Sequence, residues 1–185
     1  MPRNRHSILS ITPGRSRLGV AVFHNGTLIY YVGKSLRQFR SETELLHAVK
    51  KILAKLIERY AIRTVLVPEL NRQQRHSDGV VLIDRLIESF VRSRGVRVNR
   101  YDPLIVRRSL CGETRPTKSN TAHSLSKRYV ELTRFLFGES DWERRYYGYV
   151  FGAIAGGEVF VRNRQIFTKS ARTDRTTQRV ERGGV

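Results

Sequence analysis

The order in which two hydrophobic periodicities follow one another constrains this chain more than any other feature. Short apolar runs typical of β-strands lie at residues 7–12, 18–23, 27–32, 64–68 and 96–101. Asn25-Gly26 separates the second run from the third, and this dipeptide is typical of a hairpin turn. The first three runs therefore predict an antiparallel meander, whereas longer patterns separate the later runs.

Those longer patterns have the period of an α-helix. They cover residues 42–60, 78–94, 104–110, 118–137 and 142–161. Ser41 is expected to cap the first helix in a capping box with Glu44, and Asp78 to cap the second. Residues 71–76 are expected to form a polar, basic loop. Three antiparallel strands followed by alternating helices and strands predict an α/β fold, a mixed five-stranded sheet flanked by helices.

The charge of the chain is strongly unbalanced. It contains 35 lysines and arginines against 16 aspartates and glutamates, a formal net charge of +19. Such an excess opposes folding through self-repulsion, and a polyanionic partner, most commonly nucleic acid, offsets it. We expect residues 1–161 to form one folded domain and residues 162–185 to form a basic, disordered tail.

Several functional classes are disfavoured by what the sequence contains. Cys111 is the single cysteine, so we expect neither a disulfide framework nor a cysteine metal site. The apolar stretch after the basic start is broken by Thr12, Pro13 and Gly14, which argues against a signal peptide. No uninterrupted apolar run is long enough to span a bilayer. These observations favour a cytoplasmic or nucleoid location with no membrane partner.

Five segments, taken together, resemble a known family. They read ILSITPGRSRLGVAV at residues 8–22, VLVPEL at 65–70, YDPLIVRRSLCG at 101–112, a basic loop and helix start at 114–125, and RYYGYVFGAIAG at 145–156. Their order and spacing resemble the RuvC family of Holliday-junction resolvases, which has an RNase H-like fold. The resemblance covers roughly residues 7–161, and it implies an RNase H-like domain that binds nucleic acid.

The same resemblance implies four acidic positions that hold two divalent metal ions for phosphodiester cleavage. The first of these positions falls on Thr12 and the second on Glu69. The last pair falls on Tyr146 and Tyr149 or, one residue along, on Tyr147 and Val150. Only Glu69 is an acid, so the catalytic motif is degenerate.

A single glutamate beside threonine and tyrosine hydroxyls is a poor site for a hard divalent ion. We therefore expect impaired catalysis and no cofactor. If activity survives, Glu69 is the metal ligand for Mg²⁺ or Mn²⁺, with help from Asp141 or Glu143 in a rearranged site. The alternative role for Glu69 is an ion pair with a nearby arginine.

Basic residues cluster around the segments that carry the resemblance. The candidate nucleic-acid-binding residues are Arg15, Arg17, Arg72, Arg75, Arg107, Arg108, Arg115, Lys118, Lys127 and Arg128. A basic rim around a former carboxylate pocket is suited to phosphates.

Three functions remain open at this level. The first is a binding module for branched or duplex DNA that cleaves it inefficiently. The second is an active, metal-dependent, structure-specific endonuclease with a rearranged site around Glu69. The third is a structural RNA-binding subunit of a ribonucleoprotein. DNA is favoured over RNA, and the resemblance also implies a homodimer.

Overall fold

The computed structural model describes residues 7–112, 114–136 and 141–163, except for the side chains of Gln73 and of residues 141–146. The elements are β1 (Ser7–Pro13), β2 (Arg17–His24), β3 (Thr27–Ser35), α1 (Glu42–Arg59), β4 (Ile62–Pro68), α2 (Arg72–Arg75), α3 (Asp78–Ser93), β5 (Arg97–Tyr101), α4 (Pro103–Cys111), α5 (Lys118–Arg128), the 3₁₀ helix η1 (Val130–Phe135) and α6 (Asp141–Arg162). Among these residues, no helix is long and apolar enough to cross a membrane.

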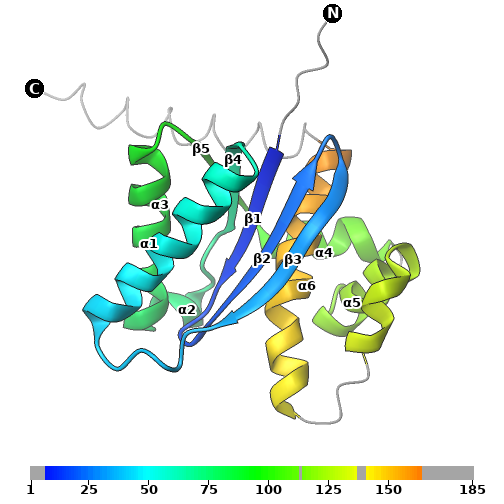
Figure 1. The fold of residues 1–185 in the computed structure, drawn as a ribbon. Coiled ribbons are helices and arrows are strands. Elements are labelled where there is room, and N and C mark those ends of the chain that lie inside the picture. The colour runs from blue at the N-terminus through cyan, green and yellow to red at the C-terminus, as the bar shows by residue number, and fades with distance from the viewer. Residues whose placement is uncertain (1–6, 113, 137–140, 164–185) are drawn as a thin grey trace, which may run out of the picture.

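The strands form one mixed sheet in the order β3-β2-β1-β4-β5. β1 pairs antiparallel with β2, and β2 pairs antiparallel with β3. β1 pairs parallel with β4, and β4 pairs parallel with β5. Helices α1 and α3 cover one face of the sheet, and α4, α5 and α6 cover the other (Figure 1). The predicted RNase H-like architecture is confirmed, including the hairpin turn, where Asn25 and Gly26 both have positive φ.

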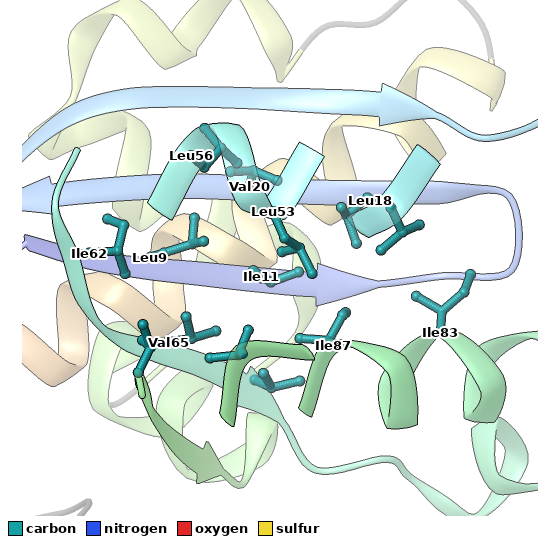
Figure 2. Close-up of a cluster of buried hydrophobic side chains, with 14 of the residues drawn as sticks. Leu9, Ile11, Leu18, Val20, Leu53, Leu56, Ile62, Val65, Ile83 and Ile87 are labelled. Carbon is teal, nitrogen blue, oxygen red and sulfur yellow. The ribbon is translucent and has the colours of Figure 1, made fainter. Parts of the chain in front are cut away.

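The face beneath α1 and α3 is an aliphatic core. Leu9 and Ile11 of β1 point into it, together with Leu53 of α1 and with Ile83 and Ile87 of α3 (Figure 2). All five side chains are fully buried. Burial of one such side chain contributes about 1.5–3 kcal/mol. Asp84 of α3 is also buried, and it forms an ion pair with Arg100.

The face beneath α6 is packed more closely and with smaller residues. A Cβ atom at Gly19 of β2 would lie 2.0 Å from the Tyr149 carbonyl oxygen, and one at Gly157 of α6 would lie 2.1 Å from Phe23 Cε2. Glycine costs helix stability, and here the gain is contact between the α6 backbone and the sheet. α6 is thereby held in one position against β1 and β2.

One helix predicted from the pattern is wrong in extent. The segment 118–137 divides into α5 and η1, because the backbone leaves helical geometry at Tyr129. The Tyr129 hydroxyl donates a hydrogen bond to Glu158 of α6, and Arg128 Nε lies 3.0 Å from the same carboxylate. Glu158 is only 1% exposed, so a tertiary contact with a buried charge overrides the helical pattern.

Smaller differences concern helix starts. The predicted loop 71–76 contains the single turn α2, in which Asn71 and Gln74 exchange backbone-to-side-chain hydrogen bonds. Ser77, not Asp78, is the N-cap of α3. Ser41 does cap α1, since its Oγ accepts from the Glu44 N–H. Of the predicted tail, residues 164–185 lie outside the described part of the chain.

Candidate nucleic-acid interface

A cavity of about 940 Å³ opens on the α6 side of the sheet, at the end of β1. We call it the α6 cavity. Its lining comes from the end of β1, the start of β2, the ends of β4 and β5, and helices α4, α5 and α6. Because β1 and β4 are parallel neighbours, their carboxyl ends meet at one edge of the sheet, where ligands bind in open α/β folds.

Thr12, Tyr101 and Tyr149 line the α6 cavity. The Tyr101 hydroxyl donates a hydrogen bond to the Gly152 carbonyl oxygen of α6 at 3.5 Å, and Thr12 Oγ1 is buried. Tyr149 packs on the turn after β1, since a Cβ atom at Gly14 would lie 2.3 Å from Tyr149 Cε1. Gly152, one turn further along α6, faces Thr12, and a Cβ atom there would lie 3.0 Å from Thr12 Oγ1. The surface of α6 that meets the end of β1 therefore presents Tyr149 and a glycine, not carboxylates.

Burial governs the chemistry of these hydroxyls. Burial raises the pKa of Tyr101 to about 12, although the nearby Thr12 and Ser10 hydroxyls oppose the shift. Tyr101 thus keeps its proton at neutral pH and remains a hydrogen-bond donor. The Oγ atoms of Ser10 and Thr12 are themselves buried without a well-formed hydrogen bond. Ser10, Thr12 and Tyr101 therefore form a small buried polar cluster on the α6 face of the sheet.

The last two positions that the resemblance implies are acidic fall either on Tyr146 and Tyr149, the first register, or on Tyr147 and Val150, the second register. The structure places the side chains of these two pairs differently. Tyr149 faces the end of β1, as the first register expects, while Tyr146 lies outside the described side chains. In the second register, Val150 is buried in the core and the Tyr147 ring packs on Phe135 with ring centroids 4.3 Å apart. Asp141 and Glu143 also lie outside the described side chains.

Glu69 is not brought into the α6 cavity. Its side chain is exposed, and its backbone N–H donates to the Tyr101 carbonyl oxygen at 2.8 Å. The residue of β4 that lines the cavity is Pro68. Side chains alternate along a strand, so Pro68 shares the α6 face with Leu66, while Val67 points to the opposite face. The sequence motif could not distinguish these two adjacent positions.

The described residues do not fit a two-metal centre. No group of three or more histidine, cysteine, aspartate or glutamate side chains is close enough to hold a metal ion in the described part of the chain. Asp102 is the one acid in the described lining of the α6 cavity, and its Oδ1 accepts a hydrogen bond from Leu104 N at 2.7 Å as the N-cap of α4. Hydroxyls do not replace the carboxylates that a hard divalent pair requires.

Cations dominate the charge of the α6 cavity. Three predicted binding residues, Arg17, Arg107 and Lys118, are brought together in its lining. Arg17 is only 4% exposed. Arg37 also lines the cavity and was missed by the sequence patterns. The hairpin register could have found it, because Arg17 pairs with Ser35 and Arg37 follows two residues later.

The other predicted basic residues lie outside the lining. Arg15 extends over the start of α3, where a Cβ atom at Gly79 would lie 3.3 Å from Arg15 Cγ. All of this group are exposed, namely Arg15, Arg72, Arg75, Arg108, Arg115, Lys127 and Arg128. Arg128 pairs with Glu158, and it lies about 15 Å from Lys118, the length of α5. Arg128 therefore stabilises the contact between α5 and α6.

The comparisons with known proteins bear on the fold. No protein-family model and no curated protein matches the chain. Among solved structures, RuvC of Thermus thermophilus superposes with a TM-score of 0.66 at 17% sequence identity, covering 86% of this chain and 95% of that protein. The same protein in complex with a Holliday junction gives a TM-score of 0.65 at 16% identity, covering 88% and 97%. A fowlpox virus resolvase complexed with Holliday junction DNA gives 0.57 at 13% identity, covering 86% and 99%.

These likenesses extend over nearly the whole described chain. They establish that it has the fold of RuvC, which confirms the expectation taken from the five sequence segments. At these low sequence identities the likeness establishes the fold alone. An activity has to be argued from the residues of this chain.

Proposed function

We propose that this chain binds branched or duplex DNA through the α6 cavity and cleaves it inefficiently. The observation that carries this proposal is the charge of the cavity lining, in which the basic side chains of Arg37, Arg107 and Lys118 reach solvent and the one acid of the described lining is a helix cap. Guanidinium and ammonium groups suit a phosphodiester backbone.

Two further observations support nucleic acid as the partner. The net charge of +19 calls for a polyanion. The resolvases with which the fold is shared are described as bound to Holliday junctions. Recognition of a backbone from this cavity would depend on shape and charge, since the basic groups address phosphates, not base edges.

The proposal of inefficient cleavage rests on the donor set. Glu69 is exposed beside the cavity, and Thr12 and Tyr149 stand where the resemblance implies acids. Removing metal ligands costs orders of magnitude in metal-dependent rates. The nuclease alternative therefore requires Glu69 to act with groups outside the described side chains.

One experiment separates the alternatives. The purified full-length chain is incubated with a labelled four-way junction, a duplex and a structured RNA at one fixed salt concentration, with Mg²⁺, with Mn²⁺ or with a chelator. We expect retention of the junction and the duplex, weaker retention of the RNA, no dependence on the divalent ion, and no cleavage. Cleavage that disappears in Glu69→Ala would establish the nuclease alternative, and preference for the RNA would establish the ribonucleoprotein alternative.

Matched variants locate the binding surface. Lys118→Met removes a cation from the α6 cavity, whereas Lys127→Met removes one from the same helix outside it. We expect Lys118→Met to weaken duplex binding about tenfold, the worth of one charge-assisted contact, and to lower the salt slope by about 0.9. Lys127→Met should change neither. Equal effects of the two variants would remove the α6 cavity from the proposal.

The homodimer and the cytoplasmic or nucleoid location stay predictions. Sedimentation of the chain with and without a junction measures the oligomeric state directly.

A further inference from the structure

A second hollow lies on the opposite face of the sheet, between α1 and β3. We call it the α1 groove, and its volume is about 950 Å³. The β3 residues that line it are Tyr30 and Lys34. Both side chains point to the α1 side, since residues of one strand that are an even number apart share a face. Helix α1 and helix α6 lie on opposite faces of the sheet (Figure 1), and their core clusters are separate.

The charge of the α1 groove is strongly positive. Lys34, Lys51, Lys55 and Arg59 line it, and Glu44 is the one acid of the described lining. The Glu44 carboxylate accepts a hydrogen bond from the Arg40 N–H at 3.1 Å at the start of α1. Arg59 Cζ lies over the Tyr60 ring, 5.4 Å from its centroid, so this cation already packs on an aromatic ring of the groove. Lys34, Lys51 and Lys55 are the cations that the lining offers to an anionic ligand.

The cations on α1 form a row. Lys51, Lys55 and Arg59 are each four residues apart, and all three are exposed. Residues with this spacing lie on one helix face, about 6 Å apart along the axis. A regular row of cations complements the regular row of phosphates in a nucleic-acid strand.

Aromatic rings lie beside that row. Tyr30 and Tyr60 have ring centroids 5.6 Å apart at an interplanar angle of 32°. Phe39 contributes a third ring, and Ile52 and Leu56 complete the apolar floor. A cationic row along an aromatic floor is the arrangement with which proteins bind single-stranded nucleic acid, because bases stack on the rings and phosphates contact the cations.

We propose that the α1 groove binds a single-stranded segment of nucleic acid, with phosphates along Lys51 and Lys55 and a base against Tyr30 and Tyr60. An acidic peptide strand is disfavoured by the lining. Such a strand would pair with the open backbone edge of β3, whereas the groove is formed by side chains above the face of β3. The proposal is independent of the α6 cavity, which lies on the other face.

The test uses a labelled oligothymidylate of about 12 nucleotides and fluorescence anisotropy with the full-length chain. Lys55→Met removes a cation from the groove, and Lys50→Met removes one from the same helix outside it. We expect Lys55→Met to lower the salt slope of binding by about 0.7 and the affinity about tenfold. Lys50→Met should leave both as in the parent chain. Equal effects of the two variants, or no binding of the oligonucleotide, would overturn the proposal.

Stacking is tested at Tyr60. Tyr60→Leu should weaken oligothymidylate binding about tenfold, whereas Tyr60→Phe, which keeps the ring, should bind as the parent chain does. Thermal melting of both variants checks that the fold is intact. Loss of binding in Tyr60→Phe would contradict stacking as the role of the ring.

Two further experiments identify the ligand of the α1 groove and the site at which it binds. A polyglutamate peptide that binds more tightly than the oligonucleotide, and is released by Lys55→Met, would replace nucleic acid with an acidic protein partner. Photo-crosslinks from an iodouracil-substituted oligonucleotide should map to α1 and β3. Crosslinks confined to α4, α5 or α6 would place single-strand binding in the α6 cavity and overturn the proposal.

Discussion

The face of the sheet beneath α1 and α3 is closed by apolar side chains, whereas the face beneath α6 also buries hydroxyls and glycines. On the first face, Leu53 and Ile87 fill the space between helix and sheet. On the second, Ser10 and Thr12 lie buried beneath the α6 cavity. Both faces bury an apolar cluster, and only the second combines it with buried hydroxyls at the α6 cavity.

The comparison also separates two kinds of basic surface. The α6 cavity has Arg17 in its lining, a buried residue at the start of β2. The α1 groove places its cations on the exposed side of a helix. The α6 cavity therefore draws its cations from several elements that meet at the end of β1, whereas the α1 groove draws most of its cations from the regular spacing of residues on one helix.

The largest expected effect on stability comes from a substitution in the aliphatic core beneath α1 and α3. Leu53→Ala should lower the free energy of unfolding by about 2–5 kcal/mol, because a fully buried side chain leaves a cavity. Duplex binding at 10 °C, below the lowered melting temperature, should be unchanged. Denaturant unfolding measures the first quantity and anisotropy the second. A loss of duplex affinity in the folded variant would mean that the two faces are coupled.

The next effect tests the polar face through Tyr101. The unfolded chain loses this proton near pH 10, whereas the folded chain holds it to about pH 12. A raised pKa contributes stability that is complete below pH 10 and is lost as pH rises toward 12, by about 3 kcal/mol at most. The decline over that window should be smaller in Tyr101→Phe than in the parent chain. Parallel curves from pH-dependent denaturation would show that Tyr101 is not the group responsible.

The smallest effect compares two glycines of α6. Gly157→Ala should destabilise the fold by about 1–3 kcal/mol, because the new Cβ would lie 2.1 Å from the buried Phe23 ring. Gly148→Ala is the matched control, since a Cβ there meets nothing within 4 Å, and it should stabilise the helix by about 0.5–1 kcal/mol. Thermal melting of both variants gives the sign of each change. A destabilised Gly148→Ala would mean that close packing extends along the whole helix.

Much of this fold could be predicted from the sequence because its periodicities are local. The apolar alternation of β1, the Asn25-Gly26 turn and the stripe of α1 each lie within a short segment. The break at Tyr129 could not be predicted, since it depends on Glu158, which lies 29 residues further along the chain. Long-range contacts with a buried charge leave no periodic signal.

The sequence pointed to part of the candidate site, because those residues lie in short local motifs. Thr12, Tyr149, Arg17, Arg107 and Lys118, which come from separate sequence segments, line one cavity, and their roles stay predictions. Glu69 does not line that cavity, because side-chain alternation gives the position to Pro68. The α1 groove is lined by residues of two consecutive elements, β3 and α1, and of the loop between them, and it depends on how the helix packs over the strand, which no periodic pattern encodes.

The central position of β1 has a consequence for how the chain folds. β1 is the first strand in the sequence, yet it lies in the middle of the sheet, between β2 and β4. One edge of β1 pairs with β2, which follows it in the chain after only a few residues. Its other edge pairs with β4, residues 62–68, which come much later in the chain. During synthesis the β1-β2-β3 meander can form early, while the parallel half requires closure of a long loop. Until β4 arrives, the strand that will be most protected in the native sheet is the one with an open edge.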